Sequence, residues 1–125
     1  MSEQPKARSY RDLLVWQKGI VLAKVTYELT SRFPSEEKFG LISQMRRAAV
    51  SVPSNLAEGQ ARRTTGDFVR FISTAEGSIA ELDTQLVIAE RLNYCTPADV
   101  SLMGERILEL RKMLNSLRRR LSGRG

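Results

Sequence analysis

The 125-residue chain carries 20 Lys and Arg against 14 Asp and Glu, and it contains no histidine and one cysteine. A chain without histidine cannot form a Ser-His-Asp triad, a Cys-His pair or an imidazole metal site, and one cysteine cannot close an internal disulfide. The net charge of +6 favours a polyanion or an acidic protein as partner.

The length suits a single domain over residues 1–125, with a flexible polar opening at 1–9 and a basic tail at 118–125. No uninterrupted apolar run approaches the roughly 18 residues of a membrane-spanning helix, and the opening residues lack the apolar stretch of a signal peptide. We therefore expect a cytoplasmic protein without a membrane partner. Cys95 has no second thiol beside it in the sequence and is interpreted as a spectator.

Four helices and no strand are expected, because a short oxygen-bearing side chain followed by an acid occurs four times. Such a pair caps exposed amides at a helix start, and the acid favours the positive end of the helix dipole. The pairs are Ser9 with Asp12, Ser35 with Glu36 and Glu37, Thr64 with Asp67, and Thr96 with Asp99. Pro97 suits the first position of the last helix. The predicted helices cover residues 10–32, 36–60, 65–93 and 97–121.

The first two helices carry apolar side chains in steps of three and four. In the first, the predicted core stripe is Leu13, Trp16, Ile20, Ala23 and Tyr27, widened by Leu14, Val21 and Val25. In the second, it is Leu41, Met45, Ala49, Val52 and Leu56. This second stripe continues through Pro53 within "RRAAVSVPSNLAEG", although proline normally ends or kinks a helix. We therefore expect Pro53 within the helix or at a bend, with Val52 and Leu56 facing the core.

The third and fourth helices repeat the same period. The third carries Phe68, Phe71 or Ile72, Ala75, Ile79, Leu82, Leu86 and Ala89. The fourth carries Val100, Met103, Ile107, Leu110, Leu114, Leu117 and Leu121. Four helices of similar length joined by short loops predict an all-α, up-down four-helix bundle.

Two further stripes lie away from the predicted core. They contain Arg47, Ser51, Ser54 and Glu58 on the second helix, and Arg70, Thr74, Gly77, Glu81, Thr84 and Ile88 on the third. Glycine inside an exposed helix costs about 1 kcal/mol relative to alanine, so Gly77 suggests close approach by another backbone. One interpretation is an oligomer interface formed by Arg47, Ser51, Ser54, Glu58, Gly77 and Glu81. The other is a solvated face with a tolerated glycine.

The cationic excess is concentrated at the carboxyl end. It consists of Arg111, Lys112, Arg118, Arg119, Arg120 and Arg124, with no acidic residue in the same stretch. These charges favour the negative end of a helix dipole and improve solubility. They also fit an arm that binds the phosphates of a nucleic acid. Both interpretations remain open at this point.

Other catalytic chemistry is largely absent from the sequence. A di-iron bundle needs Glu-x-x-His pairs, which Glu58, Glu76, Glu81 and Glu90 cannot supply without histidine. There is no phosphate-binding Gly-x-x-x-x-Gly-Lys-Ser/Thr loop, and "EGSIAE" falls within a predicted helix. We expect no catalytic residue, no metal and no cofactor. Acid–base catalysis by carboxylates alone is the enzymatic alternative.

Three stretches resemble a known family. "FPSEEKFGL", "RRAAVSVPSNLAEG" and "GSIAELDTQL" are similar to segments of bacterial four-helix-bundle proteins first noticed as reading frames inside intervening sequences of 23S ribosomal RNA genes. The match covers Asp12 to Tyr94, and the helix predicted at 97–121 agrees by its pattern.

The resemblance implies a left-handed up-down bundle that assembles as a homopentameric ring without established catalytic activity. It also implies distant kinship with accessory proteins of diversity-generating retroelements, which are basic pentamers that associate with reverse transcriptase and nucleic acid. The family's recurring positions correspond to Arg47, Ser51, Pro53, Asn55, Glu58, Gly59, Gly77, Ser78 and Glu81. This chain departs from the family pattern at Gln60, where a long aromatic is common, and at Glu76, where a basic residue is common.

The leading hypothesis is therefore a non-enzymatic homo-oligomer that binds RNA or DNA as an accessory factor. A ring would multiply weak electrostatic contacts with phosphates. The alternative is a protein-binding scaffold or accessory subunit whose basic tail meets an acidic protein.

Overall fold

The computed structural model describes residues 9–123, and four long helices account for most of this range. They are α1 (Leu14–Thr30), α2 (Leu41–Gln60), α3 (Thr65–Arg91) and α4 (Pro97–Leu121). Two short 3₁₀ turns, η1 (Tyr10–Asp12) and η2 (Ser35–Glu37), precede α1 and α2. Within the described range no strand is present, so the predicted all-α class is confirmed.

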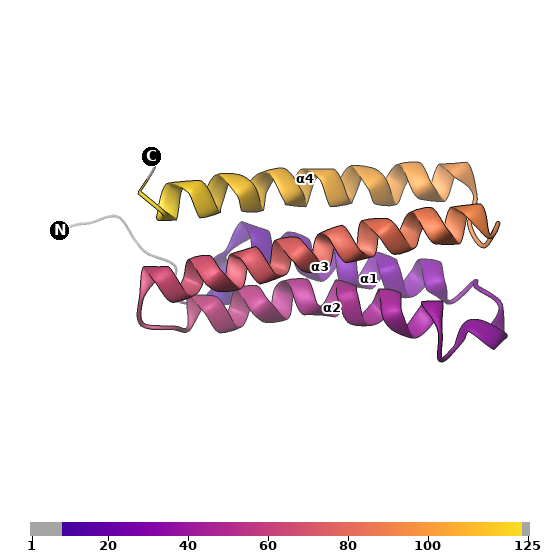
Figure 1. The fold of residues 1–125 in the computed structure, drawn as a ribbon, viewed down its shortest axis with the longest axis horizontal. Coiled ribbons are helices and arrows are strands. Elements are labelled where there is room, and N and C mark those ends of the chain that lie inside the picture. Colours follow the sequence, from indigo (N-terminus) through magenta and orange to yellow (C-terminus); the bar gives the residue numbers. More distant parts are fainter. Residues whose placement is uncertain (1–8, 124–125) are drawn as a thin grey trace.

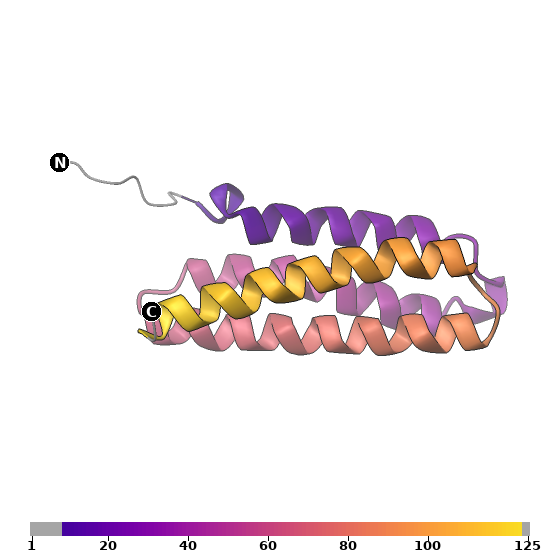
Figure 2. The ribbon, with the colours of Figure 1, turned by 90° about the horizontal axis from the view of Figure 1, so that it is seen from above.

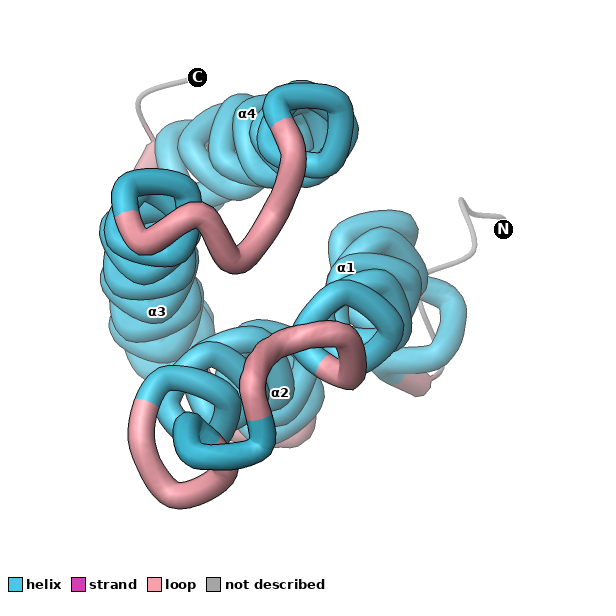
Figure 3. Tube along the Cα trace, turned by 90° about the vertical axis from the view of Figure 1, so that its right-hand side faces the viewer, coloured by secondary structure: helices cyan, strands magenta, loops and turns pink. Residues whose placement is uncertain are grey.

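Successive helices run in opposite directions and form a four-helix bundle (Figure 1). Viewed along the bundle, each helix packs beside two others, and the diagonal pairs α1–α3 and α2–α4 do not approach closely (Figure 3). The α2–α3 contact is the most extensive, and the α1–α4 contact the least extensive, of the four. From above, α4 runs obliquely over the space between α1 and α3 (Figure 2). The left-handed sense implied by the resemblance stays a prediction.

The last two helices begin where the capping residues predict. The hydroxyl of Thr64 accepts a hydrogen bond from the Asp67 amide at 3.1 Å. Thr96 and Asp99 form a reciprocal capping box, with both bonds at 3.1 Å, and Pro97 occupies the first turn of α4. Local hydrogen bonding therefore fixes these starts.

The first two helices begin later than predicted. Ser9 caps only the turn η1, and the extended backbone of Leu13 separates that turn from α1. Gly40, with φ −110° and ψ −112°, separates η2 from α2. The Oε1 atom of Glu37 accepts a hydrogen bond from the Leu41 amide at 3.0 Å and so caps the true start of α2. The predicted helices at 10–32 and 36–60 are each interrupted by one non-helical connection.

Pro53 lies inside α2, as predicted, and the core stripe passes through it. Val52 and Leu56 are both fully buried. Pro53 itself is buried against Gly19 of α1, where a Cβ atom would lie 3.3 Å from the Pro53 Cβ. The absence of a side chain at Gly19 therefore gives the proline ring space between the two helices.

The predicted core face of α1 is confirmed in part, because Leu13, Trp16, Ala23 and Val25 are partly buried and pack against the core, but the most buried face lies about one residue away. The buried positions are Val15, Gly19, Leu22, Thr26, Leu29 and Thr30. Ile20 and Tyr27 remain 43% and 45% exposed. Apolar residues nearly surround this helix, and its true core face contains a glycine and two threonines. The hydroxyls of Thr26 and Thr30 donate to the carbonyls four residues earlier, both at 2.8 Å, so these side chains are buried without unpaired hydroxyls.

The predicted stripes of α3 and α4 are largely confirmed. Ile72, rather than Phe71, takes the ambiguous buried position on α3. The fully or nearly fully buried members of the two stripes are Ile72, Ala75, Ile79, Leu82, Leu86, Ala89, Met103, Ile107, Leu110 and Leu114. Phe68, Val100, Leu117 and Leu121 are partly buried and pack against this cluster.

The helices α2 and α3 pack tightly at Gly59. A Cβ atom there would lie 2.6 Å from the Phe71 Cβ and 3.0 Å from the Phe68 Cδ1. Contacts this short leave no room for a side chain without movement of α3. Gly59 is therefore required by packing between these helices.

We predict that Gly59→Ala destabilises the protein and that Gly104→Ala, in α4, does not. Both changes gain helix propensity, but only the first meets packed atoms, since nothing lies within 4 Å of a Cβ at Gly104. Urea unfolding followed by circular dichroism should show a loss of about 1–3 kcal/mol for Gly59→Ala. Gly104→Ala should gain up to about 1 kcal/mol. Equal stability of the two variants would contradict the packing role of Gly59.

Candidate nucleic-acid and oligomer interfaces

Two of the predicted phosphate-binding residues on α4 are held by acids on α3. The Nε atom of Arg118 lies 2.7 Å from the Glu76 Oε1, and the same guanidinium donates to the Asn115 Oδ1 at 2.8 Å. A terminal nitrogen of Arg111 lies 3.3 Å from the Asp83 Oδ2. These ion pairs link α3 to α4. The carboxyl-terminal stretch lacks acids in sequence, but the fold supplies them from another helix.

Three other cations of the predicted group remain exposed on α4. Lys112, Arg119 and Arg120 form no ion pair with any residue in the described range 9–123. Together with Asn115 and Ser116, they line an open depression of about 390 Å³. Positions 112, 116, 119 and 120 share one face of a helix because they are spaced by three or four residues. Arg124, the sixth predicted residue, lies outside the described part of the chain.

On the other predicted surface, Ser51 of α2 is part of a contact within the chain. Its hydroxyl lies 2.8 Å from the Ser78 hydroxyl of α3. The side-chain Nδ2 of Asn55 donates hydrogen bonds to the Ser51 backbone carbonyl at 2.8 Å and to the Ser51 hydroxyl at 2.9 Å. Ser51 therefore fastens α2 to α3, a role that its helical spacing alone did not reveal.

Arg47 and Glu81, both predicted at an oligomer interface, line one depression between α2 and α3. Its volume is about 300 Å³, and Ser51 and Gln85 also contribute. Gln85 is only 8% exposed, and its Oε1 atom has no hydrogen-bond partner among the described residues.

The remaining predicted interface residues are exposed. Glu58 pairs with Arg62 one helical turn later, at 2.8 Å, and Ser54 faces solvent. Gly77 is exposed, with no atom within 4 Å of a Cβ built on it. The close approach expected at Gly77 therefore does not occur within one chain. The tight packing of α3 on α2 occurs instead at Gly59. In the sequence, only the recurring family position of Gly59 pointed to this residue.

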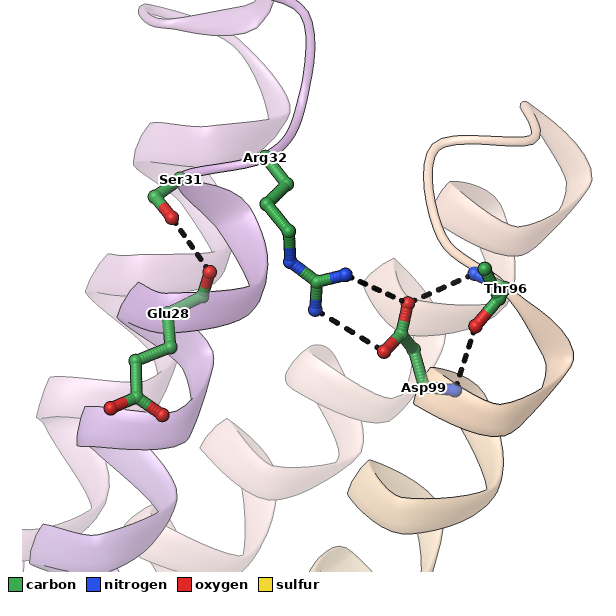
Figure 4. A network of polar contacts seen from close by, with 5 residues as sticks. All are labelled: Glu28, Ser31, Arg32, Thr96 and Asp99. Atoms are coloured by element: carbon green, nitrogen blue, oxygen red, sulfur yellow. Dashed lines mark hydrogen bonds and ion pairs between the residues drawn. The ribbon is translucent and has the colours of Figure 1, made fainter.

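Asp99 is the acid with the most hydrogen-bond donors at the ends of α1 and α4. Its carboxylate accepts from the Thr96 amide and, at 3.2 and 3.3 Å, from the Arg32 guanidinium (Figure 4). The Thr96 amide, then Arg32, hold the pKa of Asp99 below its usual value. This network joins the two helix ends.

A second polar link fixes the connection before α2. The Tyr94 hydroxyl donates to the Glu37 Oε2 at 2.8 Å. Hydrogen bonds from the Leu41 amide and the Tyr94 hydroxyl lower the pKa of Glu37, and the Glu37 carboxylate raises the pKa of Tyr94. Burial raises the pKa of the neighbouring Cys95 thiol, which makes this thiol a poorer nucleophile at neutral pH. Glu37 and Tyr94 therefore act as a structural link between the end of α3 and the start of α2.

Neither a metal centre nor a membrane span is formed within residues 9–123. No three His, Cys, Asp or Glu side chains converge there as a metal ion would require. Across the same residues, each helix is too short or too polar to cross a bilayer.

The fold and these surfaces define a basic, all-α four-helix-bundle protein. The family model described as 23S rRNA-intervening sequence protein matches residues 11–116. The chain belongs to this family. No curated protein matches it.

A solved structure supports the same architecture. It is a protein of unknown function from the S23 ribosomal protein family of Bacteroides thetaiotaomicron, and it matches with a TM-score of 0.75 and 22% sequence identity. The match covers 83% of this chain and 97% of that chain. At this identity the likeness establishes the fold.

We predict that Asp99→Asn destabilises the protein at pH 7 by about 1–2 kcal/mol, because the carboxylate caps α4 and pairs with Arg32. The folded-state pKa of Asp99 is lowered, so its contribution is present above the unfolded value of about 3.9 and is lost as pH falls through the folded value. The free energies of unfolding of the variant and the wild type should therefore converge once the pH falls below the folded-state pKa of Asp99. Asp83→Asn, which removes the exposed partner of Arg111, is the control and should change stability by less than about 1 kcal/mol. A difference for Asp99→Asn that persists unchanged at low pH would contradict this account.

Proposed function

We propose that this protein is a non-enzymatic homo-oligomer that binds nucleic acid, with RNA as the first candidate, and acts as an accessory factor in the cytoplasm. The observation that carries the proposal is the exposed group of Lys112, Arg119 and Arg120, which no acid within the described residues neutralises. Phosphate contacts of this kind are independent of sequence and add up when several copies act together.

The oligomeric part of the proposal rests on the outer face of α2 and α3. Gly77 is exposed with free space around it, and Arg47 and Glu81 line a depression between α2 and α3. A second copy packed on this face would give Gly77 the close neighbour that justifies a glycine inside a helix. A pentameric ring is the assembly that the family resemblance implies.

A protein-binding scaffold is the second candidate, and an apolar groove between α1 and α4 favours it. Leu13, Leu14, Met113 and Leu117 line this groove of about 430 Å³, and Lys112 and Arg120 also contribute. An acidic partner with an apolar anchor would suit this combination.

For nucleic-acid binding, we predict that replacing Lys112, Arg119 and Arg120 together by Ala weakens binding to single-stranded RNA. The slope of log affinity against log salt should fall by about 0.7 for each phosphate that the variant no longer neutralises. Fluorescence anisotropy at several salt concentrations measures both quantities. This variant is cleaner than removal of residues 118–125, because Arg118 is bonded to Glu76 and its removal would disturb the bundle.

The matched control replaces Arg63, Arg91 and Arg106 by Ala, which removes the same charge from other exposed positions. It should keep most of the affinity. If the two triple variants lose affinity equally, the loss is explained by net charge alone, and Lys112, Arg119 and Arg120 do not form a specific binding site. If the wild type binds no RNA at low salt, the protein-binding scaffold becomes the favoured function.

For assembly, we predict that Gly77→Leu lowers the mass of the protein in solution, because a large side chain would block close packing of a second copy on α3. Multi-angle light scattering measures the mass. Gly66→Leu, another glycine of α3 with nothing within 4 Å, is the control and should leave the mass unchanged. An unchanged mass for Gly77→Leu at unchanged stability would reject this interface.

A further inference from the structure

A cationic and aromatic surface lies far from the basic end of α4. Phe39 is 90% exposed between η2 and α2. It lines an open concavity of about 640 Å³ whose other members are Tyr27, Lys38, Ile42, Ser43, Arg46, Arg47, Val50 and Ser51. Three of these residues are cations and none is an acid. This surface, which we call the Phe39 surface, lies toward the end of the bundle opposite the carboxyl terminus (Figure 1).

The guanidinium of Arg46 is held in place on this surface. Its Nε atom donates to the Thr30 hydroxyl at 2.9 Å, and a terminal nitrogen donates to the Tyr27 carbonyl at 3.3 Å. Its central carbon also lies 4.4 Å from the centre of the Tyr27 ring. The other terminal nitrogen makes no hydrogen bond within the described residues. A cation fixed in this way loses little side-chain entropy when it binds an anion.

The exposed Phe39 ring offers a flat apolar face on which a planar group can stack. A phenylalanine side chain exposed to water gains free energy when another molecule covers it, because apolar surface is removed from water. The Nζ atom of Lys38 lies 5.5 Å from the centre of the ring, so a positive charge is close to the place where such a partner would stack. Every nucleobase offers a flat face for stacking, and its phosphate brings the opposite charge.

We propose that the Phe39 surface binds single-stranded nucleic acid, with a base stacked on Phe39 and phosphates paired with Lys38 and Arg46. This inference rests on the proposed function and adds a base-stacking element that the arginines of α4 lack. The three cations of the surface and the absence of acids among its lining residues favour a polyanion as occupant, and a second copy of this chain is an outcome that the test below distinguishes.

The test measures the binding of a short fluorescent single-stranded RNA, and of a duplex of the same sequence, to the full chain. Phe39→Ala should weaken single-strand binding about 5- to 100-fold, the effect expected when one stacked base is released. The salt slope should stay unchanged, because no charge is removed. Duplex binding should change by less than about twofold, because paired bases are not available for stacking. Phe39→Trp should restore affinity.

Two further variants separate stacking from charge and from general effects of the surface. Lys38→Ala should lower the salt slope by about 0.7, the value for one phosphate. Leu102→Ala removes a side chain that is 60% exposed on α4 and should leave affinity unchanged.

Three results would overturn the inference. If Phe39→Ala binds like the wild type while the triple variant of α4 is weakened, the Phe39 surface is not a binding site and the proposed function stands. If the wild type binds no RNA at low salt, both the inference and the proposed nucleic-acid-binding function are rejected. If Phe39→Ala lowers the mass in solution without changing RNA affinity, a second copy of the chain covers the surface.

Discussion

The contact between Gly19 and Pro53 determines how α1 and α2 can pack. A proline inside a helix removes one backbone donor and adds a ring that needs space. Gly19 provides that space, because any side chain there would press on the ring at about 3.3 Å. With this space α2 packs against α1 as one continuous helix, in which Met45 and Leu56 lie in the same fully buried stripe. Since α2 packs extensively against both α1 and α3, the arrangement of three helices depends on this contact.

The predicted cations of α4 fall into two groups that differ in their neighbours. Arg111 and Arg118 pair with acids of α3 and so belong to the contact between these helices. Lys112, Arg119 and Arg120 point to another face of α4, where no such acid lies within the described residues. A count of positive charge along the sequence combines the two groups. The exposed group is the part of the predicted cationic cluster that no acid of the described residues pairs.

The proposed nucleic-acid contacts lie at the two ends of the bundle. The exposed cations of α4 supply charge, and the Phe39 surface combines charge with an aromatic ring. A strand that contacted both ends would follow the long axis of the bundle (Figure 1). In a ring of several copies, each weak contact would be repeated at a high local concentration. This arrangement needs no catalytic group, and the perturbed acids Glu37 and Asp99 join helix ends instead.

The sequence by itself determined the helical class, the starts of α3 and α4, and the passage of α2 through Pro53. These features depend on capping residues and apolar spacing, which act over one or two helical turns. The family resemblance also pointed to Ser51 and Gly59 as recurring positions, although not to their roles.

Only the tertiary structure decided which face of α1 is buried and which charges are free. The true core face of α1 contains threonines whose hydroxyls bond within their own helix, so hydropathy did not identify it. The acids that hold Arg111 and Arg118 lie on α3, 28 and 42 residues away in sequence. The Phe39 surface likewise brings Tyr27 beside residues of α2. Contacts between distant residues depend on the rotation and approach of whole helices, which are set by packing of the complete core.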